Sequence, residues 1–199
     1  DNTTLKFYGN YSQDKVGIYT TSPTFNGYFG SKSKSYFGNL KLSSALSSTS
    51  LFEISTSYSK YDSDIGFSIL ENNDVTSYGK VRADYTTPLN STMNFKTGLE
   101  YEYNDYSANG KAPRYSYNIR PDAPTVSYSS ALHSGRIGGY GEVNMRLFDD
   151  FYAITGLRSD YSTLSQKVNF DPRLSMVYRL AENNFIKGAT GIYHQYTSL

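Results

Sequence analysis

Residues 93–106, MNFKTGLEYEYNDY, decide the fold class of this chain. Apolar and aromatic side chains alternate with polar and charged ones, so that Leu99 and Tyr101 belong to one face and Glu100 and Glu102 to the other. A period of two is typical of a β-strand whose faces meet different surroundings. The stretch is long against the roughly five or six residues of a soluble strand, and it fits a membrane-crossing strand of about 9–11 residues.

Residues 136–147 follow the same rule, with Ile137 and Val143 on one face and Arg136 and Glu142 on the other. Weaker alternation predicts further strands along the rest of the chain. They are expected at residues 3–11, 15–22, 35–46, 50–61, 75–86, 151–162, 172–181 and 184–194. The sequence therefore predicts about ten strands and no helix.

The composition narrows the fold class further. The chain has 21 Tyr, 11 Phe, no Trp and no Cys, and its Leu, Ile and Val are too thinly spread to fill a conventional core. No stretch approaches the about 18 consecutive apolar residues of a membrane helix. Only one face of each strand in a transmembrane barrel meets lipid, so a mean hydropathy below zero is expected there. The predicted fold class is all-β, a transmembrane antiparallel β-barrel.

The residue types argue against catalysis and against nucleic acid as a partner. The net charge is +1, and positive and negative residues are interspersed without a basic block. His133 and His194 lack a second histidine or a spaced carboxylate for a metal site, and Ser134 beside His133 is a weak nucleophile signal among so many serines. The glycines within 138–141 precede a strand, so they are interpreted as strand glycines that relieve crowding. We expect no enzyme activity and no cofactor.

The expected connections alternate in length. Short ones are predicted at 12–14, 47–49, 87–91, 149–150 and 182–183, and longer ones at 23–34, 62–74, 107–134 and 163–171. Outer-membrane barrels have short periplasmic turns and longer extracellular loops. With ten strands, both ends of the chain would lie on the extracellular side. A complete barrel has its ends in the periplasm and usually closes on an aromatic residue, so residues 1–199 are expected to form one partial barrel domain without a plug.

The segment GGYGEVNMRLFDDFYAITGLRSDYS, residues 138–162, resembles a stretch of TonB-dependent outer-membrane receptors. In that family a Y-x-E/Q strand leads by a tight turn into a G-x-R-x-D strand. Residues 169–196 look like the family's P-R-L/hydrophobic-x-Y strand and the hairpin after it. The matching positions are Tyr140, Glu142, Gly156, Arg158, Asp160, Pro172, Arg173, Leu174 and Tyr178. The first 130 residues resemble the family in style, and their Ser, Asn and Tyr content is similar to receptors of Bacteroidetes-type bacteria.

The resemblance implies a function and a set of partners. The chain would supply part of a barrel of about 22 strands in the outer membrane of a Gram-negative bacterium. The receptor would bind a scarce nutrient, such as an iron chelate, a corrinoid or a glycan, and admit it when TonB pulls on the plug. Implied partners are outer-membrane lipid, the rest of the barrel, the plug domain, TonB through that plug, and surface lipoproteins.

Charged residues on the polar faces of the strands are expected to face the barrel lumen. They are Lys80, Arg82, Asp84, Lys96, Glu100, Glu102, Arg136, Glu142, Arg146, Arg158 and Asp160. They could contact plug or substrate. We favour the alternative, in which they form cross-strand ion pairs that keep charge out of lipid without binding a ligand.

Aromatic residues are expected in two girdles at the membrane interfaces. One would contain Tyr58, Tyr61, Tyr85, Tyr101, Tyr103, Tyr106 and Tyr161 near the long loops, and the other Phe52, Phe148 and Phe151 at the short turns. Four tyrosines in or beside the longest loop are candidates for stacking against a sugar: Tyr106, Tyr115, Tyr117 and Tyr128.

Three other readings stay open at this point. The chain could be a complete small outer-membrane barrel acting as a pore or an enzyme. It could be a barrel component of a secretion or surface complex. It could also be a soluble β-rich surface protein, which would fold without detergent.

Overall fold

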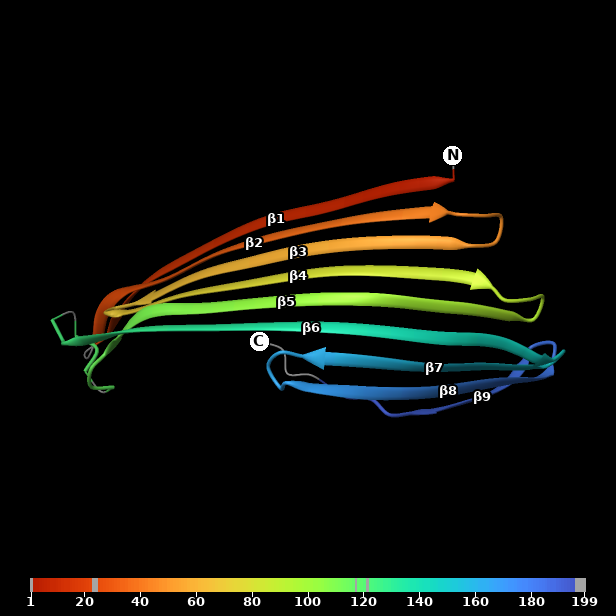
Figure 1. Ribbon diagram of the computed structural model, residues 1–199. Coiled ribbons are helices and arrows are strands. Elements are labelled where there is room, and N and C mark those ends of the chain that lie inside the picture. Colours follow the sequence, from red (N-terminus) through yellow and green to blue (C-terminus); the bar gives the residue numbers. More distant parts are fainter. Residues whose placement is uncertain (1, 23–24, 117, 121, 196–199) are drawn as a thin grey trace.

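The computed structural model describes residues 2–22, 25–116, 118–120 and 122–195, and these form one antiparallel sheet (Figure 1). Each strand pairs with its neighbours in chain order. The nine strands are β1 (Thr3–Ser22), β2 (Phe25–Ala45), β3 (Leu51–Phe67), β4 (Leu70–Pro88), β5 (Met93–Pro113), β6 (Thr125–Phe148), β7 (Phe151–Ser162), β8 (Lys167–Ala181) and β9 (Asn184–Gly191). In this part of the chain, no helix could span a membrane.

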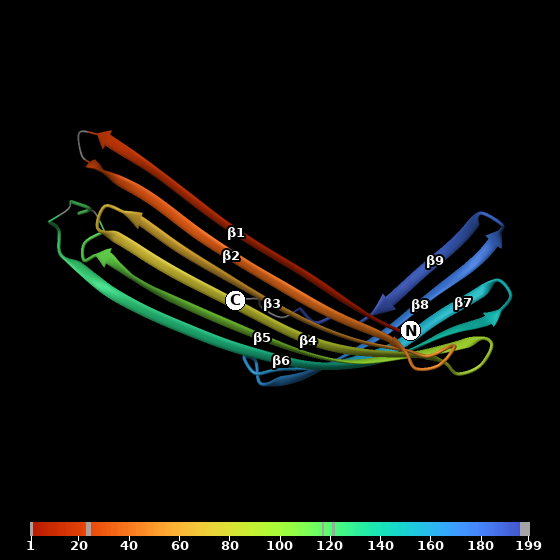
Figure 2. The same ribbon diagram turned by 90° about the horizontal axis from the view of Figure 1, so that it is seen from above.

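An unbroken register from β1 to β6 gives the sheet two distinct faces. We define the inner face as the one that carries Glu100, which lies opposite Arg82 on β4. The outer face carries Leu99, which lies opposite Ala83. The sheet curves like a segment of a barrel wall (Figure 2). Side chains crowd together on a concave face, and Glu100 is 6% exposed where Leu99 is 68% exposed, so the inner face is the concave one.

The sheet has almost no hydrophobic core of its own. Among the described residues, the buried hydrophobic side chains are Ala108 and Ala153. Large apolar side chains such as Leu5, Phe7 and Ile137 lie exposed on the outer face. A soluble sheet would bury such a face against another layer. This outer face is therefore suited to contact with lipid.

Two aromatic girdles border the apolar band of the outer face. The upper one contains Tyr58, Tyr101, Tyr103 and Tyr161. The Tyr11 and Tyr36 rings, 5.0 Å apart, lie one outward position above it on β1 and β2. The lower one contains Phe52, Tyr85, Phe95, Phe151 and Tyr178. On β5 the band runs from Phe95 to Tyr103, the length that a tilted membrane strand requires.

The predicted membership of the girdles was wrong at three positions. Tyr85 pairs with Phe52 and belongs to the lower girdle, because the turn between β4 and β5 follows it closely. Tyr61 and Tyr106 lie on the inner face, since each is an odd number of residues away from its outward-facing neighbour, Tyr58 or Tyr103.

Above the upper girdle the outer face becomes polar, although β1–β6 continue. On β5 the outward positions after Tyr103 are Asp105, Ser107 and Asn109. On β3 the outward positions after Tyr58 are occupied by Lys60, Asp62 and Asp64. Charged side chains on a lipid face are costly, so the strands leave the membrane here. We call this part of the sheet the extension: residues 10–22, 25–37, 59–67, 70–78, 104–113 and 125–135.

The extension explains why several predicted connections were wrong. Residues 12–14 lie inside β1, so the expected strands 3–11 and 15–22 are a single strand, and the described chain has nine strands rather than ten. Residues expected as long loops lie mostly in strands, leaving connections at 68–69, 114–124 and 163–166. Outside the membrane both faces of a strand meet water. Its polar sequence then carries no apolar alternation and looks like a loop.

The first strand begins at one end of the sheet, along the strand direction, and the last strand finishes at the opposite end. This corrects the prediction that both chain ends are extracellular. Thr3 pairs with Ser44, beside the connection 46–50, whereas β9 runs away from that edge toward Gly191. An odd number of antiparallel strands requires this arrangement. Within the described residues β1 pairs only with β2, and β9 only with β8, so the sheet is open.

Candidate functional site: a charge network on the inner wall

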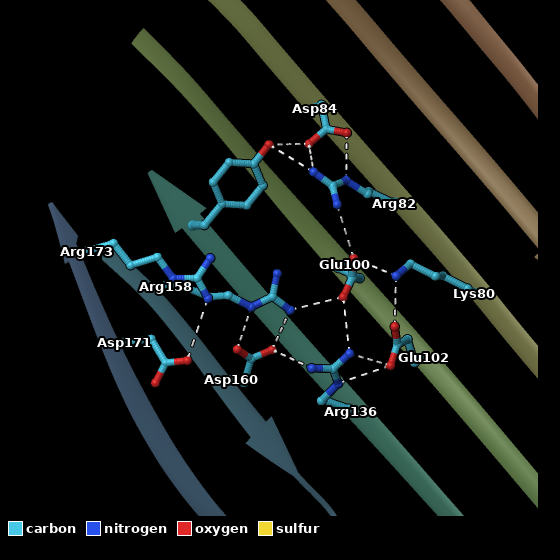
Figure 3. Close-up of polar contacts among 11 residues, drawn as sticks. Lys80, Arg82, Asp84, Glu100, Glu102, Arg136, Arg158, Asp160, Asp171 and Arg173 are labelled. Carbon is cyan, nitrogen blue, oxygen red and sulfur yellow. Dashed lines mark hydrogen bonds and ion pairs between the residues drawn. The ribbon is translucent and has the colours of Figure 1, made fainter. Parts of the chain in front are cut away.

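The Glu100 carboxylate is the centre of an ion-pair network that spans β4 to β7 (Figure 3). Its Oε2 lies 2.8 Å from Lys80 Nζ and 3.5 Å from Arg82 Nη1. Its Oε1 lies 3.0 Å from Arg158 Nη2 and 3.4 Å from Arg136 Nη2. Four cations from three strands therefore surround one buried carboxylate, and the register of the sheet brings them together.

Glu102 and Asp160 complete the anionic side of the network. Glu102 lies 2.8 Å from Lys80 Nζ and 2.5 Å from Arg136 Nη2. Asp160 receives two parallel hydrogen bonds from Arg158, from Nε at 2.6 Å and from Nη2 at 2.7 Å. Bidentate pairs of this kind fix the geometry of both side chains. The Arg158 side chain is thereby held pointing across β6 toward β5.

Gly138 provides the space that Arg158 needs to cross β6. Gly138 lies between Glu100 and Asp160 in the register. A Cβ at this position would overlap the Asp160 carboxylate and would lie 2.9 Å from Arg158 Nη2. The prediction that this glycine relieves crowding is confirmed, and the crowding group is the ion-pair network.

Gly98 on β5 leaves space for a second side chain to cross a strand. The Tyr140 ring lies over Gly98, where a Cβ would overlap it. Its hydroxyl thereby reaches β4, donating a hydrogen bond to Asp84 and accepting one from Arg82 at 3.2 Å. Arg82 also pairs with Asp84 at 2.8 Å. The family-motif residue Tyr140 therefore connects β6 to β4 across an intervening strand.

The network is balanced in charge. Its cations are Lys80, Arg82, Arg136 and Arg158, and its anions are Asp84, Glu100, Glu102 and Asp160. Buried charges that are each paired satisfy one another without a ligand. The arrangement is suited to a structural lining of the wall, and contact with a plug or substrate stays a prediction.

The remaining predicted lumen residues share the inner face but lie outside this network. Lys96 lies opposite Glu142 in the register, and Arg146 lies at the irregularity where β6 meets β7. Of the other motif residues, Arg173 is on the inner face, 3.8 Å from Asp171, and Tyr178 is on the outer face against Phe151. Both faces thus contribute to the motif.

Sequence reasoning missed Asp171, which is 4% exposed on the inner face of β8. Its Oδ1 lies 2.5 Å from His194 Nδ1, and its neighbour Arg173 stacks over the Tyr193 ring at 4.8 Å. The other histidine, His133, lies 2.5 Å from Asp105 on the outer face of the extension. Each histidine thus contacts a carboxylate and not open solvent alone. Asp171 follows Phe170 in the alternation, a signal that could have placed it on the inner face.

The tyrosines proposed to stack on sugar lie in different settings. Tyr106 and Tyr128 are in β5 and β6, on the inner face of the extension. The prediction of Tyr106 in a strand beside the loop is confirmed, whereas the prediction of Tyr128 in the loop 107–134 was wrong. Tyr115 lies in the connection 114–124, and Tyr117 falls outside the described residues. Tyr106 donates a hydrogen bond to Asp74 at 3.0 Å, which raises the pKa of its hydroxyl.

Comparison with known proteins shows the fold. No family model matches the chain, and neither does any curated protein. Among solved structures, the outer membrane transporter YddB from Escherichia coli superimposes with a TM-score of 0.72 at 12% identity, covering 96% of this chain and 29% of its own. The copper transporter OprC gives 0.66 at 13% identity, covering 93% and 31%. The ferric yersiniabactin uptake receptor FyuA from Yersinia pestis gives 0.59 at 12% identity, covering 96% and 31%.

These neighbours are TonB-dependent outer-membrane transporters, so the chain has the fold of a segment of their barrel. The predicted fold class and the recognised resemblance are confirmed at the level of the fold. The chain spans less than a third of the length of the structures described above.

Proposed function

We propose that this chain forms part of the barrel wall of a TonB-dependent receptor, which imports a scarce nutrient across the outer membrane of a Gram-negative bacterium. One observation carries the proposal. The outer face has an apolar band bordered by aromatic rings, and it turns polar directly above Tyr103, while the opposite face holds paired charges around Glu100. Lipid on one side and a polar lumen on the other require this division.

The open edges of the sheet support a role as part of a larger barrel. Unpaired backbone groups of β1 and β9 cannot face hydrocarbon without a large penalty. Further barrel strands beside each edge would satisfy them. Closure of these nine strands into a small complete barrel is not what the strand pairing favours, because β1 and β9 are not paired with each other.

The orientation follows from the extension. In this orientation the extension lies outside the cell. The short connections 46–50, 89–92, 149–150 and 182–183, at the opposite end of the strands, lie in the periplasm. A plug domain would fill the lumen against the inner face. TonB would act through that plug, so residues of this chain would bind, enclose and release substrate rather than transform it.

Cysteine labelling tests the location and orientation. The chain has no native cysteine. In the full-length protein, freed of other reactive cysteines, Asp122→Cys should react with a membrane-impermeant maleimide in intact cells. Ser48→Cys, in the connection 46–50, should react only after the outer membrane is permeabilised. Equal labelling of both variants in intact cells, or recovery of the protein in the soluble fraction, would contradict the proposal.

Energy-dependent uptake tests the transport function. Cells carrying the full-length gene are given radiolabelled ferric citrate, cyanocobalamin or maltohexaose, with and without a protonophore. Accumulation of one of them that the protonophore abolishes supports the proposal. If none accumulates in an energy-dependent manner in cells whose labelling pattern is correct, the chain belongs to a barrel without active import.

A further inference from the structure

The inner face of the extension lacks positive charge. We define the cation-free wall as the inward-facing residues of 10–16, 31–37, 59–65, 72–78, 104–110 and 128–134, which lie side by side in the register. It contains Ser, Thr, Asn and aromatic side chains together with the aliphatic Val16, Ile65, Ala108 and Leu132, and its charged members are Asp14 and Asp74, both acidic.

The lysines of the extension face the other way. Lys15, Lys32 and Lys34 belong to the outer face of β1 and β2, as do Lys60 on β3 and Lys111 on β5. A site for an anionic iron chelate concentrates positive charge and hydrogen-bond donors toward the ligand. This wall presents hydroxyl and amide groups together with two carboxylates. It would therefore repel an anionic ligand and accept a neutral ligand that is rich in hydroxyl groups.

Tyr128 forms a flat platform on this wall. Its hydroxyl end lies over Gly110, where a Cβ would come within 2.6 Å of Cζ. Its hydroxyl donates a hydrogen bond to Asn72, whose amide donates to Asp74. Tyr106 donates to the other oxygen of Asp74. These hydrogen bonds fix the position of the Tyr128 side chain. Tyr128 is 40% exposed, so part of its surface stays open to a ligand.

The surroundings of the platform have room for a ligand. A hollow of about 1030 Å³ in this part of the sheet is lined by Asn72, Gly110 and Tyr128. Lys15 and Lys111 also line it, but they belong to the outer face of their strands. The apolar C–H face of a sugar ring packs against an exposed aromatic face, and nearby amides and hydroxyls bond its rim. The side chains of the wall supply both kinds of contact.

We infer that the cation-free wall binds a neutral oligosaccharide, with Tyr128 as its stacking platform and Asn72 and Asp74 as the residues that position it. This inference rests on the proposed receptor function and names the substrate class of the same lumen. A neutral peptide is the competing ligand. It would bond chiefly through backbone groups and would depend less on a single aromatic face.

Calorimetry on the full-length receptor in detergent tests the inference. The probes are maltohexaose, cellohexaose, xylohexaose, ferric citrate and the hexapeptide Gly-Ser-Gly-Ser-Gly-Ser with blocked ends. We expect one hexasaccharide to bind, with an affinity that changes less than twofold between 0.05 and 0.5 M salt because no ion pair is involved. Binding of ferric citrate or the peptide in place of every hexasaccharide would overturn the inference.

Substitutions locate the site. Tyr128→Ala should weaken oligosaccharide binding by at least tenfold, because the platform is removed. Tyr128→Phe keeps the ring but loses the hydrogen bond to Asn72, and should weaken binding by a few-fold. Tyr19→Ala is the matched control, an exposed tyrosine on the outer face of the same extension, and should bind as the parent does. Unchanged binding by Tyr128→Ala would place the sugar elsewhere and overturn the assignment.

The outcome is separable from that of the proposed function. A receptor that accumulates ferric citrate in an energy-dependent manner and binds no hexasaccharide refutes the substrate class and leaves the import role intact. Incorrect cysteine labelling refutes the receptor role itself.

Discussion

Arg158 on β7 reaches over a whole strand to place its Nη2 atom 3.0 Å from the carboxylate of Glu100 on β5. The strand between them contributes Gly138 at the crossing point. Contacts between next-nearest strands are unusual in a sheet, because a side chain on the middle strand normally fills the gap. Because Gly138 has no side chain, Arg158 passes over β6 and connects β7 to β5.

Gly138→Val should destabilise the barrel by about 2–4 kcal/mol, because the new side chain displaces Arg158 and leaves Glu100 with an incomplete set of partners. The free energy of unfolding in detergent, from a urea titration of the full-length protein, measures the effect. Gly139→Val is the matched control. That glycine lies on the outer face, where an added Cβ would lie 3.1 Å from the tip of Leu99 and 3.8 Å from the Gly98 carbonyl oxygen. We expect a change within about 0.5 kcal/mol. Equal effects of the two variants would show that the passage of Arg158 over Gly138 does not account for the loss of stability.

Glu100→Gln should cost about 3–5 kcal/mol, because four cations would surround a neutral amide in a buried setting. Glu71→Gln provides the comparison. Glu71 forms a 3.0 Å pair with Lys111, but both side chains are largely exposed, so the loss should stay below about 1 kcal/mol. The same urea titration measures both. A small effect at Glu100 would mean that the neighbouring carboxylates compensate for its charge.

Leu99→Arg should impair membrane assembly by about 2–4 kcal/mol, since it places a charge near the middle of the apolar band. Ser107→Arg lies on the same strand and the same face, but in the extension, and should be tolerated. Folding into lipid vesicles, followed by the mobility shift of unheated samples in gel electrophoresis, distinguishes the two variants. If Ser107→Arg were as harmful as Leu99→Arg, the membrane boundary would lie higher on β5 than the girdle indicates.

Tyr106 should ionise above its ordinary pKa of 10.0, because its hydroxyl donates a hydrogen bond to the Asp74 carboxylate and ionisation would break it. A pKa raised in the folded state means that this stabilisation is fully present below pH 10.0 and is lost as the pH rises through the raised value. Ring-carbon NMR shifts of ¹³C-tyrosine samples, assigned with Tyr106→Phe, measure the titration. Asp74→Asn should return the pKa of Tyr106 toward 10.0. Titration at or below 10.0 in the parent protein would exclude the hydrogen bond in solution.

Much of the membrane-spanning wall could be predicted from the alternation alone. Lys80, Arg82, Glu100, Glu102 and Arg136 were placed together on one face, and they share it. The extension could not be predicted in this way. Residues 62–74 have apolar side chains only within 65–70 and polar ones on both faces at either end. They therefore lack a sustained apolar period and resemble a loop, yet β3 and β4 pair through most of them.

The sequence by itself determined the two faces of each membrane strand, because side-chain direction along a strand depends only on whether a residue number is odd or even. Only the tertiary structure decided which charges meet. Arg158 contacts Glu100, and Tyr140 contacts Asp84, because the register of several strands aligns them and because Gly138 and Gly98 leave the space between them open. Register is set by pairing across the whole sheet, so no single strand carries that information.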